Sequence, residues 1–209
     1  QDPTEFSWLT GLVTSTDDGE IVAQAIQDGV AVAISDGSFK DAFGSAAWIM
    51  QGENAEGEIL GRCCVPGPAD WQSAYRSELS GMLGSVYCIS NLVDKKGIKS
   101  GKVRIGCDGL SAIQQVQNYR VLQSPCRKHY HLISAIKTLI RNSPVDFEFF
   151  HVKGHQDDDA NAPLDRFALL NIKMDSSAKA HWTVGHEDED FRLHELIPGE
   201  GWPLWIGFE

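Results

Sequence analysis

The sequence predicts a mixed α/β fold, in which helices flank a five-stranded sheet with three antiparallel and two parallel strands. The first observation is a series of three short apolar runs, at 30–34, 43–51 and 58–65, with tight polar connections. Such a series is typical of an antiparallel meander. The second observation is that helical and strand patterns alternate after residue 65, which is typical of parallel strands with helices on the sheet faces.

The helical pattern begins after Pro66-Gly67-Pro68, which stops the third strand. Apolar residues at helical spacing predict a helix over 73–94. The other expected elements are a strand at 103–107, helices at 110–118 and 126–141, a strand at 147–152 and a helix at 164–181. Ser124-Pro125 is expected to cap and open the helix at 126–141.

We expect three parts in the chain: a leader at 1–29, a folded domain at 30–182, and a tail or linker to a further module at 183–209. With 209 residues and 42% hydrophobic residues, the composition is that of a globular protein. No apolar run is long enough to span a membrane, and no stretch has the pattern of a signal peptide. We therefore expect no membrane partner and an intracellular location.

The net charge of −11 argues against a protein that holds nucleic acid by bulk positive charge. A nucleic-acid partner would have to be attracted by bound cations or by a local basic patch. The five cysteines form no CxxC pair, and their number is odd. We interpret them as buried, reduced thiols rather than as zinc ligands or disulfides.

Two aspartates occupy the ends of predicted strands. Asp36 ends the first apolar strand and Asp108 ends the fourth, and a glycine follows each of them. Asp-Gly is by itself a strong turn signal, so either residue alone has a simple structural interpretation. The ends of strands in alternating sheets are, however, the places where binding sites gather.

Two further acids, Glu78 and Asp175, lie in the middle of the apolar arcs of their helices. A buried, ionised carboxylate without a partner costs several kcal/mol. Structural ion pairs with Arg76, Arg104 or Arg166 are one way to neutralise them. We favour a cation shared by all four acids, and carboxylate oxygens suit Mg²⁺ or Mn²⁺ better than zinc.

The residues around these acids resemble those of ribonuclease H. The resemblance covers roughly residues 30–181, and its motifs come in the family's order. They are Asp36-Gly37-Ser38 with Gly44 to Trp48, Tyr75-Arg76-Ser77-Glu78-Leu79, Ile105 to Asp108, His151 to His155, and Leu170-Asn171 through Asp175 to Ala178. The pattern is most similar to the ribonuclease H domains of retroelement polyproteins, which are fused to a reverse transcriptase.

The resemblance implies a ribonuclease H-like fold and hydrolysis of the RNA strand of RNA–DNA hybrids within such a polyprotein. It implies two Mg²⁺ ions, which Mn²⁺ can replace, at the scissile phosphate. The implied metal ligands are Asp36, Glu78, Asp108 and Asp175, with Asp36 shared by both ions. His155 matches the loop histidine that assists proton transfer and product release.

The resemblance also implies contacts with the hybrid. Gly37 and Ser38 are expected to meet the RNA backbone, and Ser73 matches a hydroxyl that holds a DNA phosphate. Arg76 either faces the substrate or pairs with an acid. An associated or fused reverse transcriptase is the expected protein partner.

The chain departs from the family at two places. Ala74 and Tyr75 stand where the family often has amide side chains that read the minor groove, which leaves open where hybrid discrimination arises. The segment between the second helix and the fifth strand is only partly basic. We therefore expect the isolated domain to bind hybrids weakly, and a fused polymerase to add affinity through effective concentration.

Three other interpretations remain. A DNA-acting nuclease of the same fold, such as an integrase or resolvase, places its acids differently, and the helical Glu78 with the loop His155 argues against it. A catalytically silent connection module is disfavoured because all four acids are present. A domain with structural ion pairs alone would leave unexplained the two acids on apolar helix faces.

Overall fold

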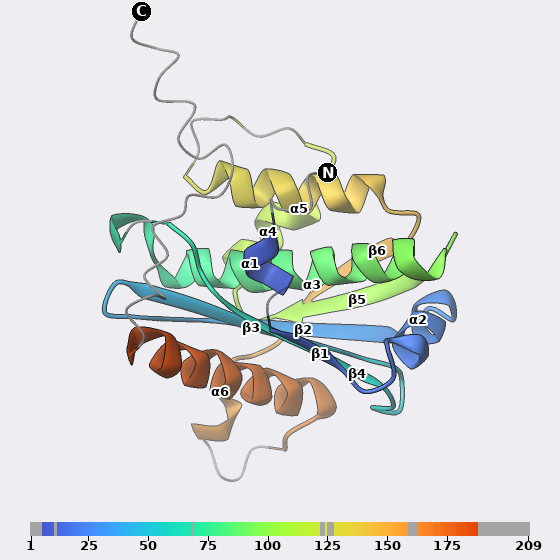
Figure 1. Ribbon diagram of the computed structural model, residues 1–209, viewed down its shortest axis with the longest axis horizontal. Helices are drawn as coiled ribbons and strands as arrows, with labels where there is room; N and C mark the ends of the chain where they lie inside the picture. The colour runs from blue at the N-terminus through green and yellow to red at the C-terminus, as the bar shows by residue number, and fades with distance from the viewer. Residues whose placement is uncertain are drawn as a thin grey trace, which may run out of the picture.

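Six strands form one sheet with helices on both faces (Figure 1). The structure is a computed structural model, which describes residues 6–10, 12–67, 69–121, 124, 128–158 and 163–187. In chain order the strands are β1 (Val13–Ser15), β2 (Ala31–Lys40), β3 (Phe43–Gln51), β4 (Glu58–Cys64), β5 (Lys102–Cys107) and β6 (Asp146–His151). Their order across the sheet is β1-β4-β3-β2-β5-β6, with β2, β5 and β6 parallel to one another and the other pairs antiparallel.

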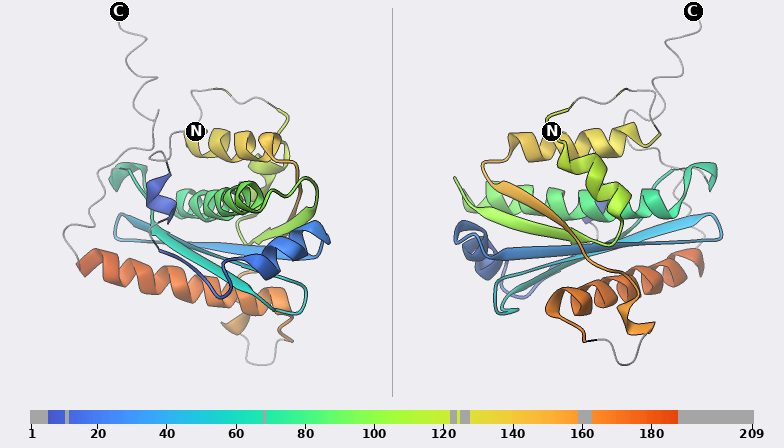
Figure 2. Two further views of the ribbon diagram at one scale, coloured as in Figure 1. Left: turned by 45° about the vertical axis from the view of Figure 1, so that its right-hand side comes forward. Right: turned by 180° about the vertical axis from the view of Figure 1, so that it is seen from behind.

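The helices lie on both faces of the sheet, and on one face a second helix layer covers the first (Figure 2). They are α1 (Ser7–Thr10), α2 (Glu20–Gln27), α3 (Ala74–Lys96), α4 (Leu110–Gln117), α5 (Tyr130–Asn142) and α6 (Arg166–Glu187), with short 3₁₀ turns at Ala69–Trp71 and Gln156–Asp158. Helix α3 packs on β2 and β3, and α5 covers α3, whereas α6 packs on the opposite face of the same two strands. Within the described part of the chain, no helix has the length and apolar character needed to cross a bilayer.

The prediction of a mixed sheet flanked by helices is confirmed, but the sheet has six strands rather than five. The additional strand, β1, lies within residues 1–29 and pairs antiparallel with β4. The neighbouring helix α2 buries Val22 and Ile26 in the core on the same face as α3. This part of the expected leader is therefore built into the folded domain, whereas residues 1–5 and 188–209 lie outside the described residues.

The expectation that Asp36 ends its strand was wrong. β2 continues to Lys40 because its second half forms a hairpin with β3, in which Lys40 pairs with Phe43. The two loop residues, Asp41 and Ala42, have φ angles of 50° and 63°. Positive φ at both positions characterises the type I′ turn, whose twist matches that of paired strands. Asp36 thus lies within a paired strand, which fixes its backbone more firmly than a strand end would.

Two helix boundaries also differ from the prediction. Helix α5 begins at Tyr130 rather than at residue 126, because His129 has a φ of 60° and so cannot continue a right-handed helix. Pro125, which was expected to form the first turn of this helix with Ser124 as its cap, lies outside the described residues. Helix α6 begins at Arg166 and continues to Glu187, beyond the predicted end at 181.

The cysteines agree with the interpretation as reduced thiols. Cys63, Cys64, Cys88 and Cys107 are free, and all but Cys88 are buried. Cys126 lies outside the described residues.

Among the described residues, Trp48 on β3 is the largest fully buried side chain, and two glycines leave the space that it fills. A Cβ on Gly61 would lie 2.2 Å from the indole ring, and a Cβ on Gly84 of α3 would lie 2.5 Å from it. These distances are far shorter than van der Waals contact. The separation between α3 and the sheet is therefore set by an indole ring packed against backbone.

We predict that Gly84→Ala destabilises the protein by about 1–3 kcal/mol, because the added methyl group overpacks a filled core. Chemical denaturation of both proteins measures the difference. Asn91→Ala, at an exposed position on the same helix, serves as the control and should change stability little. Equal stability of the Gly84→Ala and wild-type proteins would show that the core can accommodate the methyl group.

Candidate metal centre

The register of the two central parallel strands places Asp36 beside Asp108. The pairing of β2 with β5 extends to Ser35 and Cys107, and the two aspartates directly follow this last pair, Asp36 within β2 and Asp108 after the end of β5. Asp36 is 4% exposed. Its Oδ1 accepts a hydrogen bond from the backbone N–H of Gly37 at 2.7 Å, and Asn171 of α6 donates to its Oδ2 at 3.4 Å.

Helix α3 brings Glu78 to the same point. Ser73 caps the helix, since its Oγ accepts from the backbone N–H of Arg76 at 3.1 Å. The helix then touches β2 at Gly37, where a Cβ would lie 2.4 Å from the backbone nitrogen of Glu78. Because only glycine permits this approach, it is a condition for bringing Glu78 and Asp36 together.

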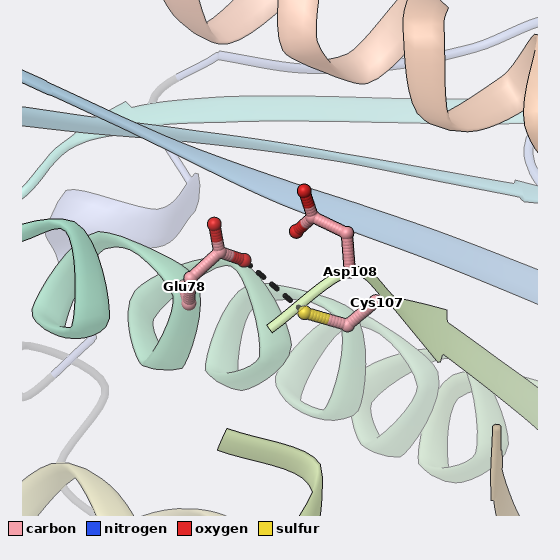
Figure 3. A group of neighbouring side chains, drawn as sticks. All are labelled: Glu78, Cys107 and Asp108. Atoms are coloured by element: carbon pink, nitrogen blue, oxygen red, sulfur yellow. Dashed lines mark hydrogen bonds between the residues drawn. The ribbon is translucent and has the colours of Figure 1, made fainter. Parts of the chain in front are cut away.

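Glu78, Cys107 and Asp108 point toward one another (Figure 3). One possible ligand atom from each of them lies within 4.8 Å of the others. The thiol of Cys107 donates to Glu78 Oε2 at 3.1 Å. Asp108 Oδ1 is buried and has no hydrogen-bond partner among the described residues.

Asp175 approaches from α6, on the opposite face of the sheet. Its side chain is half-buried, and Lys179 Nζ lies 2.6 Å from its Oδ2. Ser45 of β3 fixes the helix by donating from Oγ to the backbone oxygen of Ala178 at 2.7 Å. The negative charge of Asp175 is close enough to raise the pKa of Asp36.

His155 lies in the loop after β6. It is exposed, and its φ of 52° is in the left-handed region. The neighbouring Gly154 passes so close to Asp108 that a Cβ there would lie 2.5 Å from Asp108 Oδ2. Burial raises the pKa of Asp108, and the imidazole of His155 partly opposes that rise.

Burial and mutual repulsion disfavour the charged forms of these acids. Burial, followed by the charges of Asp108 and Asp175, raises the pKa of Asp36 to about 8. Burial and the charges of Asp36 and Asp108 hold the pKa of Glu78 well above its usual range. Burial also raises the pKa of Asp108, although His155 opposes it. A divalent cation would replace protons in such a site, so its electrostatics fit a cation held by oxygen ligands.

The three arginines considered as ion-pair partners make their contacts elsewhere. Arg76 is 1% exposed and donates to the backbone oxygen of Pro66 from Nε at 3.1 Å and from Nη2 at 2.7 Å. Arg104 pairs with Glu148 on the neighbouring strand. Arg166 donates to backbone carbonyls, including that of Gly52. These contacts favour a shared cation over structural ion pairs.

The structure brings Glu78 and Asp108 together beside Asp36. The charges of Asp175 and His155 act on these aspartates, but not all of the predicted substrate residues are placed to meet a substrate. Gly37 and Ser38 directly follow Asp36 and are partly exposed. Ser73 lies at the start of α3, where it caps the helix. The buried guanidinium of Arg76 holds the loop before α3, which is a structural position.

Three residues at this site were given no role in it from the sequence. Asn171 and Lys179 lie four residues before and after Asp175 on α6, so helical spacing could have identified both. Cys107 directly precedes Asp108 and was interpreted only as a buried thiol. Its bond to Glu78 depends on the contact between β5 and α3, which the sequence pattern does not contain.

Comparison with known proteins gives structural similarities only. No protein-family model matches the chain, and no curated protein matches it. The solved structures that it resembles include RNase H1 from the archaeon Halobacterium salinarum NRC-1, with a TM-score of 0.42 and 12% identity over 63% of this chain and 92% of that one. LC11-RNase H1, isolated from compost by a metagenomic approach, has a TM-score of 0.47 and 12% identity over 73% of this chain and 98% of that one. Similarities at this level do not establish a function, which depends on the chemistry of the site.

We predict that Asp36→Asn stabilises the metal-free protein at alkaline pH. The folded protein holds the Asp36 proton up to a pKa of about 8, whereas an unfolded aspartate loses it near 3.9. The folded state therefore binds the proton more tightly, and stability falls as pH rises through this interval. Asparagine does not ionise, so the variant does not lose this stability. Its free energy of unfolding should exceed that of the wild type by on the order of 1–3 kcal/mol at about pH 9 and differ little at about pH 4.

Denaturation in the presence of EDTA at both pH values measures this effect. Asp146→Asn changes an exposed carboxylate on β6 and is the matched control, with no gain expected. A stability difference for Asp36→Asn that is the same at both pH values would contradict the assigned electrostatics.

Proposed function

We propose that this chain is a ribonuclease H, which hydrolyses the RNA strand of RNA–DNA hybrids with divalent cations held by Asp36, Glu78, Asp108 and Asp175. One observation carries the proposal. Possible ligand atoms of Glu78 and Asp108 lie within 4.8 Å of each other. The register of β2 and β5 sets Asp36 beside Asp108, and the charge of Asp175 on the opposite face acts on Asp36. Burial and the charges of neighbouring aspartates raise the pKa of Asp36 and of Glu78, which a stabilising ion-pair network would not do.

The proposed cofactor is Mg²⁺, bound as two ions and replaceable by Mn²⁺. A donor set of carboxylate oxygens is the set that these ions prefer. When bound, the ions would neutralise charge at the scissile phosphate and make the attacking water more acidic. The four carboxylates would hold the cations, and the packing of β2 against α3 keeps two of these proposed ligands in place.

His155 is the proposed proton carrier. The reaction adds water to the phosphorus atom and breaks its bond to the 3′-oxygen, which leaves a 5′-phosphate and a 3′-hydroxyl. The departing oxygen needs a proton, and an imidazole is a side chain that can deliver one near neutral pH. The exposure of His155 and its place beside Asp108 suit this role.

The proposed substrate surface lies beside the carboxylates. Gly37 and Ser38 directly follow Asp36 on β2 and are partly exposed, which supports contact with the RNA backbone. Ser73 accepts the capping hydrogen bond of α3. A hydroxyl that accepts one bond can still donate another, so Ser73 remains available to a DNA phosphate.

The motif resemblance also supports a finer proposal, that this domain acts as part of a retroelement polyprotein beside a reverse transcriptase. The negative net charge is consistent with it, since a chain with a charge of −11 attracts nucleic acid poorly. Two basic residues in the partly basic segment are also turned inward, and burial, with the charge of Arg76, lowers the pKa of His129 to about 4. His129 contacts Arg76, and Lys137 donates to the backbone oxygen of Val121. A fused polymerase would supply affinity by raising the effective hybrid concentration.

We predict that the protein cuts the labelled RNA strand of an RNA–DNA hybrid in Mg²⁺ or Mn²⁺, and that Asp108→Asn lowers the rate roughly a hundredfold or more. The reason is that Asp108 supplies a ligand to the reacting centre. Gel analysis of end-labelled hybrid, duplex DNA and single-stranded RNA measures the rate and the substrate preference. Asp146→Asn, at an exposed position on β6, should retain full activity.

Cutting of duplex DNA in preference to the hybrid would indicate a DNA-acting nuclease instead. A folded protein that cuts none of the three substrates in either metal would indicate a silent binding module.

A further inference from the structure

One contact in the carboxylate group comes from a thiol. Cys107 Sγ lies 3.1 Å from Glu78 Oε2, and the backbone N–H of Gly109 donates to the same sulfur at 3.2 Å (Figure 3). We propose that Cys107 is a positioning residue. The hydrogen bond that its thiol donates fixes the Glu78 carboxylate in the orientation that binds the cation. This inference rests on the proposed function.

The chemistry of the contact makes the thiol the donor. Glu78 must be ionised to hold a cation, and an ionised carboxylate only accepts hydrogen bonds, so in the cation-binding form the proton between the two groups comes from sulfur. A thiol normally ionises near pH 8.5 and keeps its proton at neutral pH. The N–H of Gly109 occupies a lone pair of the sulfur, which leaves the S–H free to point at Glu78.

Glu78 needs a support that the aspartates do not. Glutamate has one more rotatable bond than aspartate, so it loses more conformational freedom when it is held as a ligand. Close backbone restricts it on one side, because a Cβ on Gly109 would lie 3.1 Å from Glu78 Cγ. The thiol then binds one carboxylate oxygen and leaves the other turned away from it (Figure 3).

The contact also couples two proposed ligands. Cys107 directly precedes Asp108 on β5, so one backbone segment carries a ligand and the support of a second ligand. Groups that hold metal ligands by hydrogen bonds typically change metal affinity 10–100-fold when removed. A thiol that only filled the core would change stability and leave metal affinity unaffected.

The test is Mn²⁺ binding to the full chain at neutral pH, measured by the electron paramagnetic resonance signal of free Mn²⁺. We expect Cys107→Ala to weaken binding about tenfold. Cys107→Ser, which keeps a donor at this place, should bind Mn²⁺ nearly as tightly as the wild type. Cys63→Ala removes an equally buried thiol on β4 and should not change the affinity.

A second measurement isolates the hydrogen bond. In a Glu78→Gln background, Cys107→Ala should weaken Mn²⁺ binding no further, since the supported carboxylate is already lost. Thermal unfolding of each variant confirms that it is folded.

Unchanged affinity in Cys107→Ala, or equal losses in Cys107→Ala and Cys107→Ser, would overturn the proposed role of the thiol. Failure of the proposed function gives a different result, because the wild type would then bind Mn²⁺ no better than Asp36→Asn.

Discussion

The mutual repulsion of buried carboxylates is the constraint around which this structure is arranged. Asp36, Glu78 and Asp108 all have raised pKa values, and burial is the largest cause for each. Such a group cannot assemble by its own attraction, so the packing of the rest of the molecule must impose it. The parallel pairing of β2 with β5 and the contact between α3 and Gly37 provide that packing. The site is thus held at a cost in stability, which is typical of functional centres.

The sequence predicted most of the fold because the spacing of apolar residues indicates which positions of a helix or strand are buried. The strands and helices at 43–51, 58–65 and 110–118 were placed almost as they are, since their apolar residues follow a clear period. The continuation of β2 beyond Asp36 was missed, because it depends on a hairpin turn at Asp41 and Ala42 that lacks the usual asparagine or glycine. The sixth strand was missed because β1 is short and exposed, and therefore shows no apolar pattern.

The sequence predicted the acids of the site but not the residues that support them. Acids on apolar helix faces are conspicuous, because burial of a charge needs an explanation. The supports of these acids are not conspicuous. Asn171, Lys179 and Cys107 are ordinary residues in their own elements, and they become part of the site only through contacts between elements. Arg76 is the opposite case. Its place in the glutamate motif suggested contact with the substrate or with an acid, and its burial does not support contact with the substrate.

The central claim is that the four carboxylates form one cation site. Crystals grown with Mn²⁺ test it most directly, because anomalous scattering locates the ion without any assumption about activity. We predict anomalous density bounded by Asp36, Glu78, Asp108 and Asp175, and its loss in Asp36→Asn crystals. Well-ordered crystals with no density at this point, or with density only at other surface acids, would contradict the account.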